Sequence, residues 1–459
     1  MREIQFGHGE SKASYAIGIF TTYICVNNKS LTRWTGFADF CINRITQGNV
    51  MQTSESRYIT LDAMRGFAVM GILAMNIIGF AMPEWAYITP AAYGGETFAD
   101  QMAWLFSFVF IDGKMRGLFS LLFGASLILI TERASSKGES AAQVHYRRMA
   151  WLAVFGLVHY FFIWFGDILF LYAMVGMVAF LFRNWAPARL VKWALIIFSI
   201  GLAFWGLQFG GLQILQYLAT QPDASADLVR QYNDLKSSPD FSFDIPAQVD
   251  LHRGPYLQIV GDKLADWPAL FGVVFMSIAE TLPLMMIGMA MNKSGFILGN
   301  WSPADYHRWA WRLVPAGLIA TGLLALWMIM SRFDAVTALA IFFFWGAIPR
   351  IMLTVGYAAV LILVIARFGG SPLLSRVAAA GRAAFSNYLG TSIIMTTIFY
   401  GYGFGLFGEV SRLGLWAYVL TMWAVMLAWS QPWLKQYRYG PLEWLWRSLA
   451  RGQMQDMRR

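Results

Sequence analysis

The sequence predicts an all-α fold: a polytopic integral membrane helix bundle of about ten transmembrane helices. Three observations predict it. Hydrophobic residues make up 58% of the 459 residues and charged residues 13%, about half the share of a soluble domain. Apolar runs of about 20 residues, the length that crosses a bilayer, recur along the chain. The surplus of Lys and Arg, a net charge of +9, gathers in alternate loops. These observations exclude a soluble enzyme and make the lipid bilayer, not nucleic acid, the expected partner.

Ten spans follow from reading the chain at that length. They lie near residues 63–82, 101–131, 148–165, 168–183, 190–215, 268–291, 312–330, 335–366, 384–404 and 414–431. The second and eighth runs are too long for simple helices. The second carries Asp112, Gly113 and Lys114 in its middle, and the eighth carries Pro349 and Arg350. We expect both spans to be broken or steeply tilted, because proline, glycine and charge at membrane depth need protein or water around them.

Basic residues predict the orientation of these spans. Most Lys and Arg lie in the N-terminal tail, 132–147, 183–192, 292–312, 367–382 and 432–459. The positive-inside rule makes these segments cytoplasmic, with both termini inside and the chain in the bacterial cytoplasmic (inner) membrane. Residues 449–459 form a basic tail. The acidic loop 216–267 lies outside, as an extracytoplasmic cap or as a disordered connector.

Residues 1–56 form a polar extension that differs from the single transmembrane domain expected over 57–448. We expect translation to start at Met51, with residues 1–50 an upstream artefact or a disordered tail. The two cysteines, Cys25 and Cys41, precede the first strong span and have no Cys or His nearby at metal-ligand spacing. The sequence therefore predicts no metal site.

Ionisable residues at membrane depth are the first candidates for function, because each costs about 2.5 to 3.5 kcal/mol on insertion. In the first span, one helical face carries Asp62, Arg65, Val69, Ile72 and Asn76, and it is expected to look into the bundle. Asp62 and Arg65 either anchor the cytoplasmic end as an ion pair or help to bind a substrate.

A second group surrounds the expected helix breaks: Asp112, Lys114, Arg116, Glu280 and Arg350. Its surplus of positive charge suits an anionic ligand such as phosphate, pyrophosphate or carboxylate. The alternative is internal neutralisation by the two acids and backbone carbonyls.

A candidate general base lies at the turn between the third and fourth spans. His159 and Asp167 are eight residues apart across this turn, and a carboxylate that orients an imidazole is the arrangement of a general base. The alternative is a buried histidine satisfied by a backbone carbonyl or a tyrosine.

Two segments near the C-terminus are polar or interfacial. Arg382, Ser386 and Asn387 open the ninth span, either as a polar face toward the bundle or as ordinary capping. Residues 439–447 are typical of an interfacial helix. The glycine run 401–408 is interpreted as a flexible outer end of a span, not as a nucleotide site.

Five sequence runs together resemble one known family. They are Leu61–Gly66 running on to Asn76; Asp112–Lys114 through Phe119–Ser120 to Phe123–Gly124; His159 with Gly166–Leu169 and Tyr172; Gly381–Arg382 with Asn387–Tyr388; and Gly440–Trp444. Their order and spacing resemble the YeiB-like family of bacterial membrane proteins, domain of unknown function 418. That family is similar to the transmembrane acyltransferase superfamily, which includes the lysosomal heparan-glucosaminide acetyltransferases. The resemblance implies a ten- or eleven-helix bundle with a cavity entered from both sides, and acyl transfer from a coenzyme A donor.

The chain departs from the lysosomal enzymes at one point. Their catalytic histidine lies in the loop after the first motif-bearing span, whereas loop 83–100 here has no histidine. A catalytic base would have to be His159 or a carboxylate.

Three hypotheses remain open. In the first, an acyl-coenzyme A donor places its phosphates on Arg65, Lys114, Arg116 or Arg350. His159, oriented by Asp167, deprotonates a hydroxyl of an envelope glycan or lipid, and Asn76 or Asn387 stabilises the oxyanion. This hypothesis requires His159 and Arg350 to share a cavity. The second is a transporter or flippase of an amphipathic anion such as an anionic lipid. The third is a structural or regulatory protein in which all of the charges are paired.

Overall fold

The computed structural model describes residues 54–236 and 244–459, with side chains from residue 59 onward. The regular structure in these residues is helical, and they contain no β-strand, only an isolated bridge between Tyr437 and Arg458. The prediction of an all-α fold is confirmed. The predictions for residues 1–50, including Cys25 and Cys41, lie outside the described residues.

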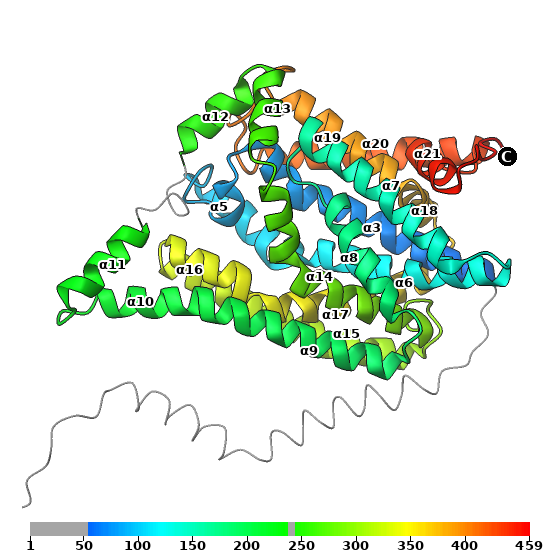
Figure 1. Ribbon diagram of the computed structural model, residues 1–459, viewed down its shortest axis with the longest axis horizontal. Coiled ribbons are helices and arrows are strands. Elements are labelled where there is room, and N and C mark those ends of the chain that lie inside the picture. The colour runs from blue at the N-terminus through cyan, green and yellow to red at the C-terminus, as the bar shows by residue number, and fades with distance from the viewer. Residues whose placement is uncertain (1–53, 237–243) are drawn as a thin grey trace, which may run out of the picture. The chain divides into compact units, whose positions relative to one another are not determined.

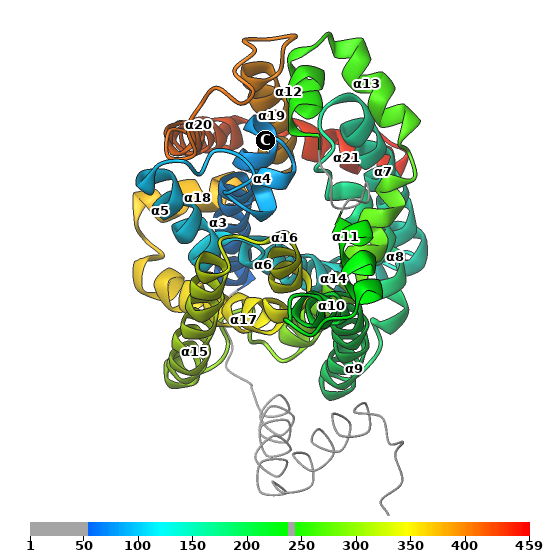
Figure 2. The same ribbon diagram turned by 90° about the vertical axis from the view of Figure 1, so that its left-hand side faces the viewer.

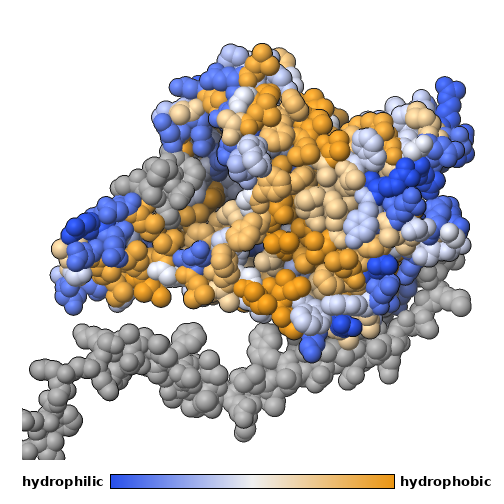
Figure 3. Space-filling model, viewed as in Figure 1, coloured by the Kyte–Doolittle hydropathy of each residue, from blue (hydrophilic) through white to orange (hydrophobic). Residues whose placement is uncertain are grey.

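Six helical stretches of the described chain are long and apolar enough to cross a membrane. They are Ile59–Ala81, Phe98–Ser136, Pro187–Ala219, Ala269–Lys293, Pro303–Met330 and Ala347–Phe368. Figure 3 shows a hydrophobic surface between two more hydrophilic ends, as expected of a protein surrounded by lipid. The protein is a helical membrane protein, and the number of ten spans stays a prediction.

The first span is α3 (Ser54–Ala81), and it packs closely on α18 (Pro372–Arg382). A Cβ atom at Gly66 would lie 2.0 Å from the Val377 carbonyl oxygen, and one at Gly381 would lie 1.8 Å from that of Asp62. Two of the sequence runs therefore meet where only glycine lets the two backbones approach.

The second span is broken where the sequence predicted. Helix α5 (Phe98–Phe106) continues into the π-helix η1 (Ser107–Ile111), the chain turns at Asp112 and Gly113, and α6 (Lys114–Ser136) follows. In Figure 2, α6 lies near the middle of the bundle, and it packs against α3, α14, α17 and α7. The break therefore places its charged residues inside protein.

The remaining long helices surround this centre (Figure 1). They are α7 (Ala141–Phe162), α8 (Leu169–Ala179) with the 3₁₀ turn η2 (Phe180–Phe182), α9 (Pro187–Trp205), the π-helix η3 (Gly206–Gly210), α10 (Gly211–Ala219), α14 (Ala269–Lys293), α15 (Pro303–Met330) and α17 (Ala347–Phe368). Helices α14 and α6 pair closely, as do α15 and α17, and α7 and α8.

The eighth predicted span is also broken, but not at its proline. Helix α16 (Ala335–Ala340) continues into the π-helix η4 (Ile341–Trp345), and α17 begins at Ala347 after Gly346. Pro349 lies in the first turn of α17, where its missing N–H leaves no helical hydrogen bond unmade.

The loop 216–267 is not a disordered connector in its described part. It forms α11 (Ala226–Lys236), α12 (Ile245–Arg253) and α13 (Tyr256–Ala265). Helix α12 binds the glycine run 401–408: Gly401 N–H donates to the His252 carbonyl over 2.8 Å, and Arg253 Nε donates to the Phe407 carbonyl over 2.8 Å.

The C-terminal part contains α19 (Ala384–Phe399), α20 (Leu415–Gln436) and α21 (Pro441–Arg451), and the short α4 (Trp85–Ile88) follows α3. The boundary predicted at residue 449 falls inside α21. The last residues fold back, because Arg438 N–H donates to the Met457 carbonyl over 2.9 Å.

Candidate functional site

A cavity of about 830 Å³ lies among the described residues and is here called the basic cavity. Residues of α3, α6, α7, α8, α18, α19, α20 and α21 line it. Its charged lining residues are Arg65, Arg133, Arg148, Arg382, Lys435, Arg438, Arg447 and Arg459, against Asp62 and Glu443. Positive charge therefore dominates its polar wall.

The rest of its wall is apolar. Val69 and Ile72 of α3, Phe123 of α6, Leu152 of α7 and Leu169 of α8 belong to it. Arg382, Lys435, Arg438 and Arg459 are exposed to solvent, whereas these apolar residues are mostly buried. The cavity is thus basic on its solvent side and apolar inside, a shape suited to an amphipathic anion.

The Asp62–Arg65 pair lies in this wall. Arg65 Nη1 donates to Asp62 Oδ1 over 2.8 Å, and Nη2 donates to Ser126 Oγ over 2.7 Å. Four residues of the predicted face, Asp62, Arg65, Val69 and Ile72, line the cavity. Asn76 is buried in α3 and is not among the described lining residues.

Arg148 is a lining residue that the sequence interpretation missed. Its guanidinium stacks 4.1 Å from the centre of the Trp446 ring, and its buried Nε has no hydrogen-bond partner in the described structure. A buried N–H without an acceptor is costly, and a bound anion would supply the acceptor. The sequence signal was weak, because Arg148 lies next to Arg147 at the edge of a basic loop.

Glu443 is a second residue that the interpretation missed. Its Oε1 accepts from the Phe385 N–H over 2.6 Å and from the Ser386 N–H over 3.2 Å, and its Oε2 accepts from Ser386 Oγ over 2.5 Å. The carboxylate therefore binds free amides in the first turn of α19 and fixes α21 there.

The polar residues at the start of the ninth span separate in the structure. Arg382 lines the basic cavity and donates to the Arg438 carbonyl over 3.3 Å. Asn387 is buried, donates to the Ala380 carbonyl over 3.0 Å, and accepts from Trp429 Nε1 over 2.8 Å. Asn387 thus connects helices and is not among the described residues that line either cavity.

The turn 163–168 brings His159 and Asp167 together, as the spacing predicted. His159 Nδ1 lies 2.9 Å from Asp167 Oδ1, and Asp167 Oδ2 accepts from the Phe170 N–H over 2.7 Å. Both side chains are fully buried, and His159 Nε2 has no partner in the described structure. Tyr388, whose ring centre lies 5.2 Å from that of His159, lines the basic cavity. The pair therefore lies behind the cavity wall, not in it.

The charges at the helix breaks are mostly paired. Arg350 Nε and Nη2 donate to the two oxygens of Glu280 over 3.0 and 2.8 Å, and Nη1 donates to the Phe342 carbonyl over 3.1 Å. Tyr87 OH donates to Asp112 Oδ1 over 2.5 Å, and Lys114 Nζ donates to the Phe108 carbonyl. These contacts favour internal neutralisation for Lys114 and Arg350.

A smaller cavity of about 190 Å³, here called the second cavity, lies beside this cluster. Arg116, Glu280 and Arg350 line it together with aromatic residues that include Trp205 and Phe343. Arg116 Nη2 lies 3.9 Å from Glu280 Oε2, which is too long for a hydrogen bond.

The predicted site residues therefore form three groups. Asp62, Arg65 and Arg382 line the basic cavity, and Arg116, Glu280 and Arg350 line the second cavity. The residues that line neither are Asn76, Asp112, Lys114, His159, Asp167 and Asn387. The requirement that His159 and Arg350 share a cavity is not met in the described structure. No group of three His, Cys, Asp or Glu among the described residues could hold a metal ion.

Comparison with known proteins relates the chain to proteins described as uncharacterised. The family model described as "Protein of unknown function (DUF418)" matches residues 291–453. The chain is 32% identical over 411 residues to "Uncharacterized protein YeiB" of Escherichia coli (strain K12), and the aligned region covers 86% of this chain and 96% of that protein. It is also 32% identical over 405 residues to "Uncharacterized protein YxaH" of Bacillus subtilis (strain 168), 86% of this chain and 94% of that protein.

A third relative, the "Uncharacterized 39.9 kDa protein in amylase 3'region" of Bacillus acidopullulyticus, is 25% identical over 410 residues, 86% of this chain and 94% of that protein. No solved structure matches the chain. Because two relatives at 32% identity align over nearly their whole length, the resemblance to the YeiB-like family is confirmed: the chain belongs to the YeiB-like DUF418 family of membrane proteins.

Proposed function

We propose that this protein binds an amphipathic anion in the basic cavity and moves it across the bacterial cytoplasmic membrane. One observation carries the proposal: a single cavity of about 830 Å³ combines a basic solvent side with an apolar interior. Ligand pockets of small molecules span about 300 to 1,000 Å³, so the volume suits one acyl or phospholipid-like chain.

The charges and the apolar wall have separate roles in this proposal. Arg65, Arg148 and Arg447 bind the anionic head, since guanidinium groups pair with phosphate or carboxylate through two parallel hydrogen bonds. The apolar wall receives the chain at about 0.8 kcal/mol per buried CH₂ group. The positive-inside rule places the basic cavity and both termini on the cytoplasmic side. Broken helices at the second cavity support a transport function, because discontinuous helices commonly form transporter sites.

Acyl transfer in the form that needs His159 and Arg350 in one cavity is contradicted by the described structure. A changed form, with the donor in the basic cavity alone, is the second candidate, and the His159–Asp167 pair favours it. Nδ1 is fixed by the carboxylate and Nε2 is left without a partner, which is the state of a general base. An acyl-coenzyme A donor would bind with its phosphates in the basic cavity, not on Lys114 or Arg350. His159 would take the proton of an envelope glycan or lipid hydroxyl as its oxygen attacks the thioester carbon. The C–S bond then breaks, and the departing thiolate receives that proton.

Two assays on the full chain in proteoliposomes test the proposal against this candidate. The first follows movement of a fluorescent phosphatidic acid between leaflets. The second follows labelled acetyl-coenzyme A with an envelope extract. Transport predicts lipid movement that Arg148→Gln slows about tenfold, with no labelled product. His307 is an exposed histidine and serves as the control. Labelled product that is lost in His159→Ala but kept in His307→Ala would show that the protein transfers acyl groups and would contradict transport. If the assays detect neither lipid movement nor labelled product, both functions are contradicted.

A further inference from the structure

The basic cavity and the second cavity approach each other along one face of α6. Phe119 lines the basic cavity and Arg116 lines the second cavity. Residues three apart on a helix lie on the same face, about 4.5 Å apart along the axis. The two cavities are thus separated by about one turn of α6.

Tyr172 of α8 lies against this turn of α6. Its ring lines the basic cavity and lies against Phe119 and Phe123, with ring centres at 5.5 and 5.3 Å. Its hydroxyl lies 2.7 Å from Ser120 Oγ and donates to the Arg116 carbonyl over 3.1 Å. Tyr172, which lines the basic cavity, is therefore hydrogen-bonded to Arg116, which lines the second cavity.

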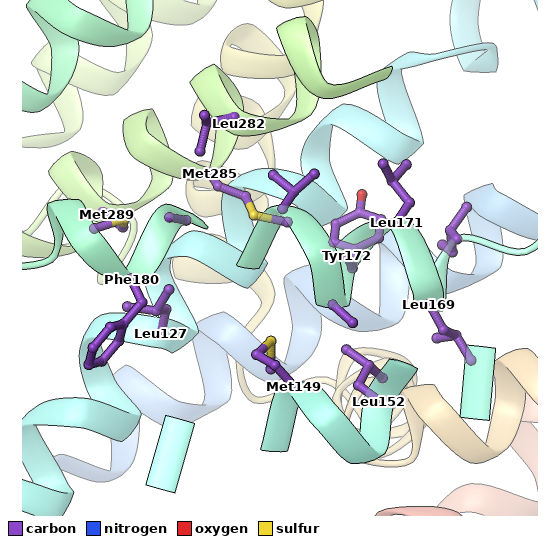
Figure 4. Close-up of a cluster of buried hydrophobic side chains, with 14 of the residues drawn as sticks. Leu127, Met149, Leu152, Leu169, Leu171, Tyr172, Phe180, Leu282, Met285 and Met289 are labelled. Atoms are coloured by element: carbon purple, nitrogen blue, oxygen red, sulfur yellow. The ribbon is translucent and has the colours of Figure 1, made fainter. Parts of the chain in front are cut away.

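The surroundings of Tyr172 are otherwise apolar. Figure 4 shows Tyr172, its hydroxyl oxygen in red, in one cluster with Leu152, Leu169 and Met285. Tyr172 is 1% exposed. Two hydrogen bonds and two ring contacts therefore hold the Tyr172 side chain next to two cavities that are both lined by arginine.

Arg116 is the cation in the second cavity that is free to bind a ligand. Arg350 is held by Glu280 and the Phe342 carbonyl. In the described structure the charged partner of the Arg116 guanidinium is the same Glu280, at 3.9 Å, and 24% of the Arg116 side chain is exposed. An anion reaching this cavity would meet a guanidinium with open donors.

We propose that the second cavity is a second binding site for the same class of anion, with Arg116 as its binding cation and Tyr172 as the closure between the two sites. This proposal rests on the proposed function, because the anion would reach the second cavity from the basic cavity. Rotation of Tyr172 about its Cα–Cβ bond breaks two hydrogen bonds and joins the two cavities. The π-helices η1 and η4 lie next to the breaks at this cluster, and such segments are frequent at functional sites.

Cysteine labelling tests the closure without any ligand. In a chain with Cys25→Ser and Cys41→Ser, Ser277→Cys reports on the second cavity and Ser375→Cys on the basic cavity. An impermeant anionic methanethiosulfonate is added to vesicles whose basic end faces the reagent, an orientation that labelling at position 375 verifies. We expect Tyr172→Ala to speed labelling at position 277 at least tenfold and Tyr172→Phe to speed it less.

Tyr306→Ala is the matched control, because Tyr306 is also buried and hydrogen-bonded, to the Phe296 carbonyl, but lines neither cavity in the described structure. An unchanged rate in Tyr172→Ala, or an equal increase in Tyr306→Ala, would overturn the closure.

Protection by decyl phosphate tests the second site. In the Tyr172→Phe background, decyl phosphate should slow labelling at position 277 at least fivefold, and Arg116→Gln should abolish this protection. Protection that survives Arg116→Gln, or none at all, would overturn the site. Binding of decyl phosphate by the basic cavity is measured separately in the wild type, so failure here is distinguishable from failure of the proposed function.

Discussion

Gly113 shows how a single residue determines the arrangement of charges at membrane depth. Its φ of +70° belongs to the left-handed region, and a Cβ atom there would lie 2.1 Å from Arg350 Cδ. A side chain at this position would be strained and would also push Arg350 away from Glu280. The glycine therefore allows both the helix break and the ion pair.

We predict that Gly113→Ala lowers the stability of the protein in detergent by at least about 1 kcal/mol, the cost of a left-handed non-glycine residue. Gly210→Ala is the control, because its φ is −68° and nothing lies within 4 Å of a Cβ there. Thermal unfolding of both variants measures the effect. Equal midpoints for the two variants would contradict this role of Gly113.

Some site residues could be predicted from the sequence, because their partners are close along the chain. Asp62 and Arg65 are one helical turn apart, and His159 and Asp167 flank one turn. Arg148 and Glu443 could not be predicted in this way. Their partners, Trp446 and Ser386, are distant in sequence, and single charges near basic loops are indistinguishable from solvated residues.

At the scale of elements, helix α12 depends on a neutral histidine. His252 is 2% exposed, its Nδ1 is bonded to the Gln248 carbonyl over 2.8 Å, and its ring stacks on Phe407 with centres 4.5 Å apart. Burial lowers the pKa of His252 to about 4, with a smaller contribution in the same direction from Lys263; the hydrogen bond to Gln248 and the charge of Asp262 act in the opposite direction. The docked helix therefore binds fewer protons than the released helix between the ordinary pKa, 6.5, and about 4.

Acidification should therefore weaken the docking of α12. The contribution of His252 is fully present above pH 6.5 and is lost progressively toward pH 4, at up to about 1.4 kcal/mol per pH unit. Hydrogen exchange of the α12 amides at pH 7.5 and pH 5, corrected for intrinsic rates, measures it. His252→Phe keeps the ring and should remove the pH dependence. The same acid sensitivity in the variant would show that another group is responsible.

Both helix breaks could be predicted from the sequence, but only one of them at the right residues. The break at 112–113 was predicted because glycine and charge coincide there. The second break was predicted near Pro349 and is found at Gly346, since proline is tolerated in the first turn of a helix. The helices of loop 216–267 could not be settled from composition. Helix α12, for example, is held by hydrogen bonds to Gly401 and Phe407, which are distant in sequence.

At the scale of the whole molecule, the distribution of charge predicts the orientation. Residues near 137, 308, 376 and 435 should be cytoplasmic, and α11 and α12 should face the opposite side. Single cysteines at Ser136, Ser375 and Ser225, labelled with an impermeant maleimide in intact and in opened cells, measure this. We expect labelling at 225 in intact cells, and at 136 and 375 only after opening. Labelling at position 375 in intact cells would show that the protein has the opposite orientation.

Binding of an amphipathic anion in the basic cavity is the property on which the proposed function depends. Equilibrium binding of decyl phosphate to the full chain in lipid nanodiscs tests it most directly, with Arg148→Gln and Arg189→Gln compared. Arg189 stacks on Trp185 as Arg148 stacks on Trp446, each with 4.1 Å to the ring centre, but it is not among the described lining residues. We predict saturable binding that Arg148→Gln weakens about tenfold, equivalent to about 1.4 kcal/mol, and that Arg189→Gln leaves unchanged. Equal affinity in the two variants, or no saturable binding by the wild type, would show that the basic cavity does not bind the anion through Arg148.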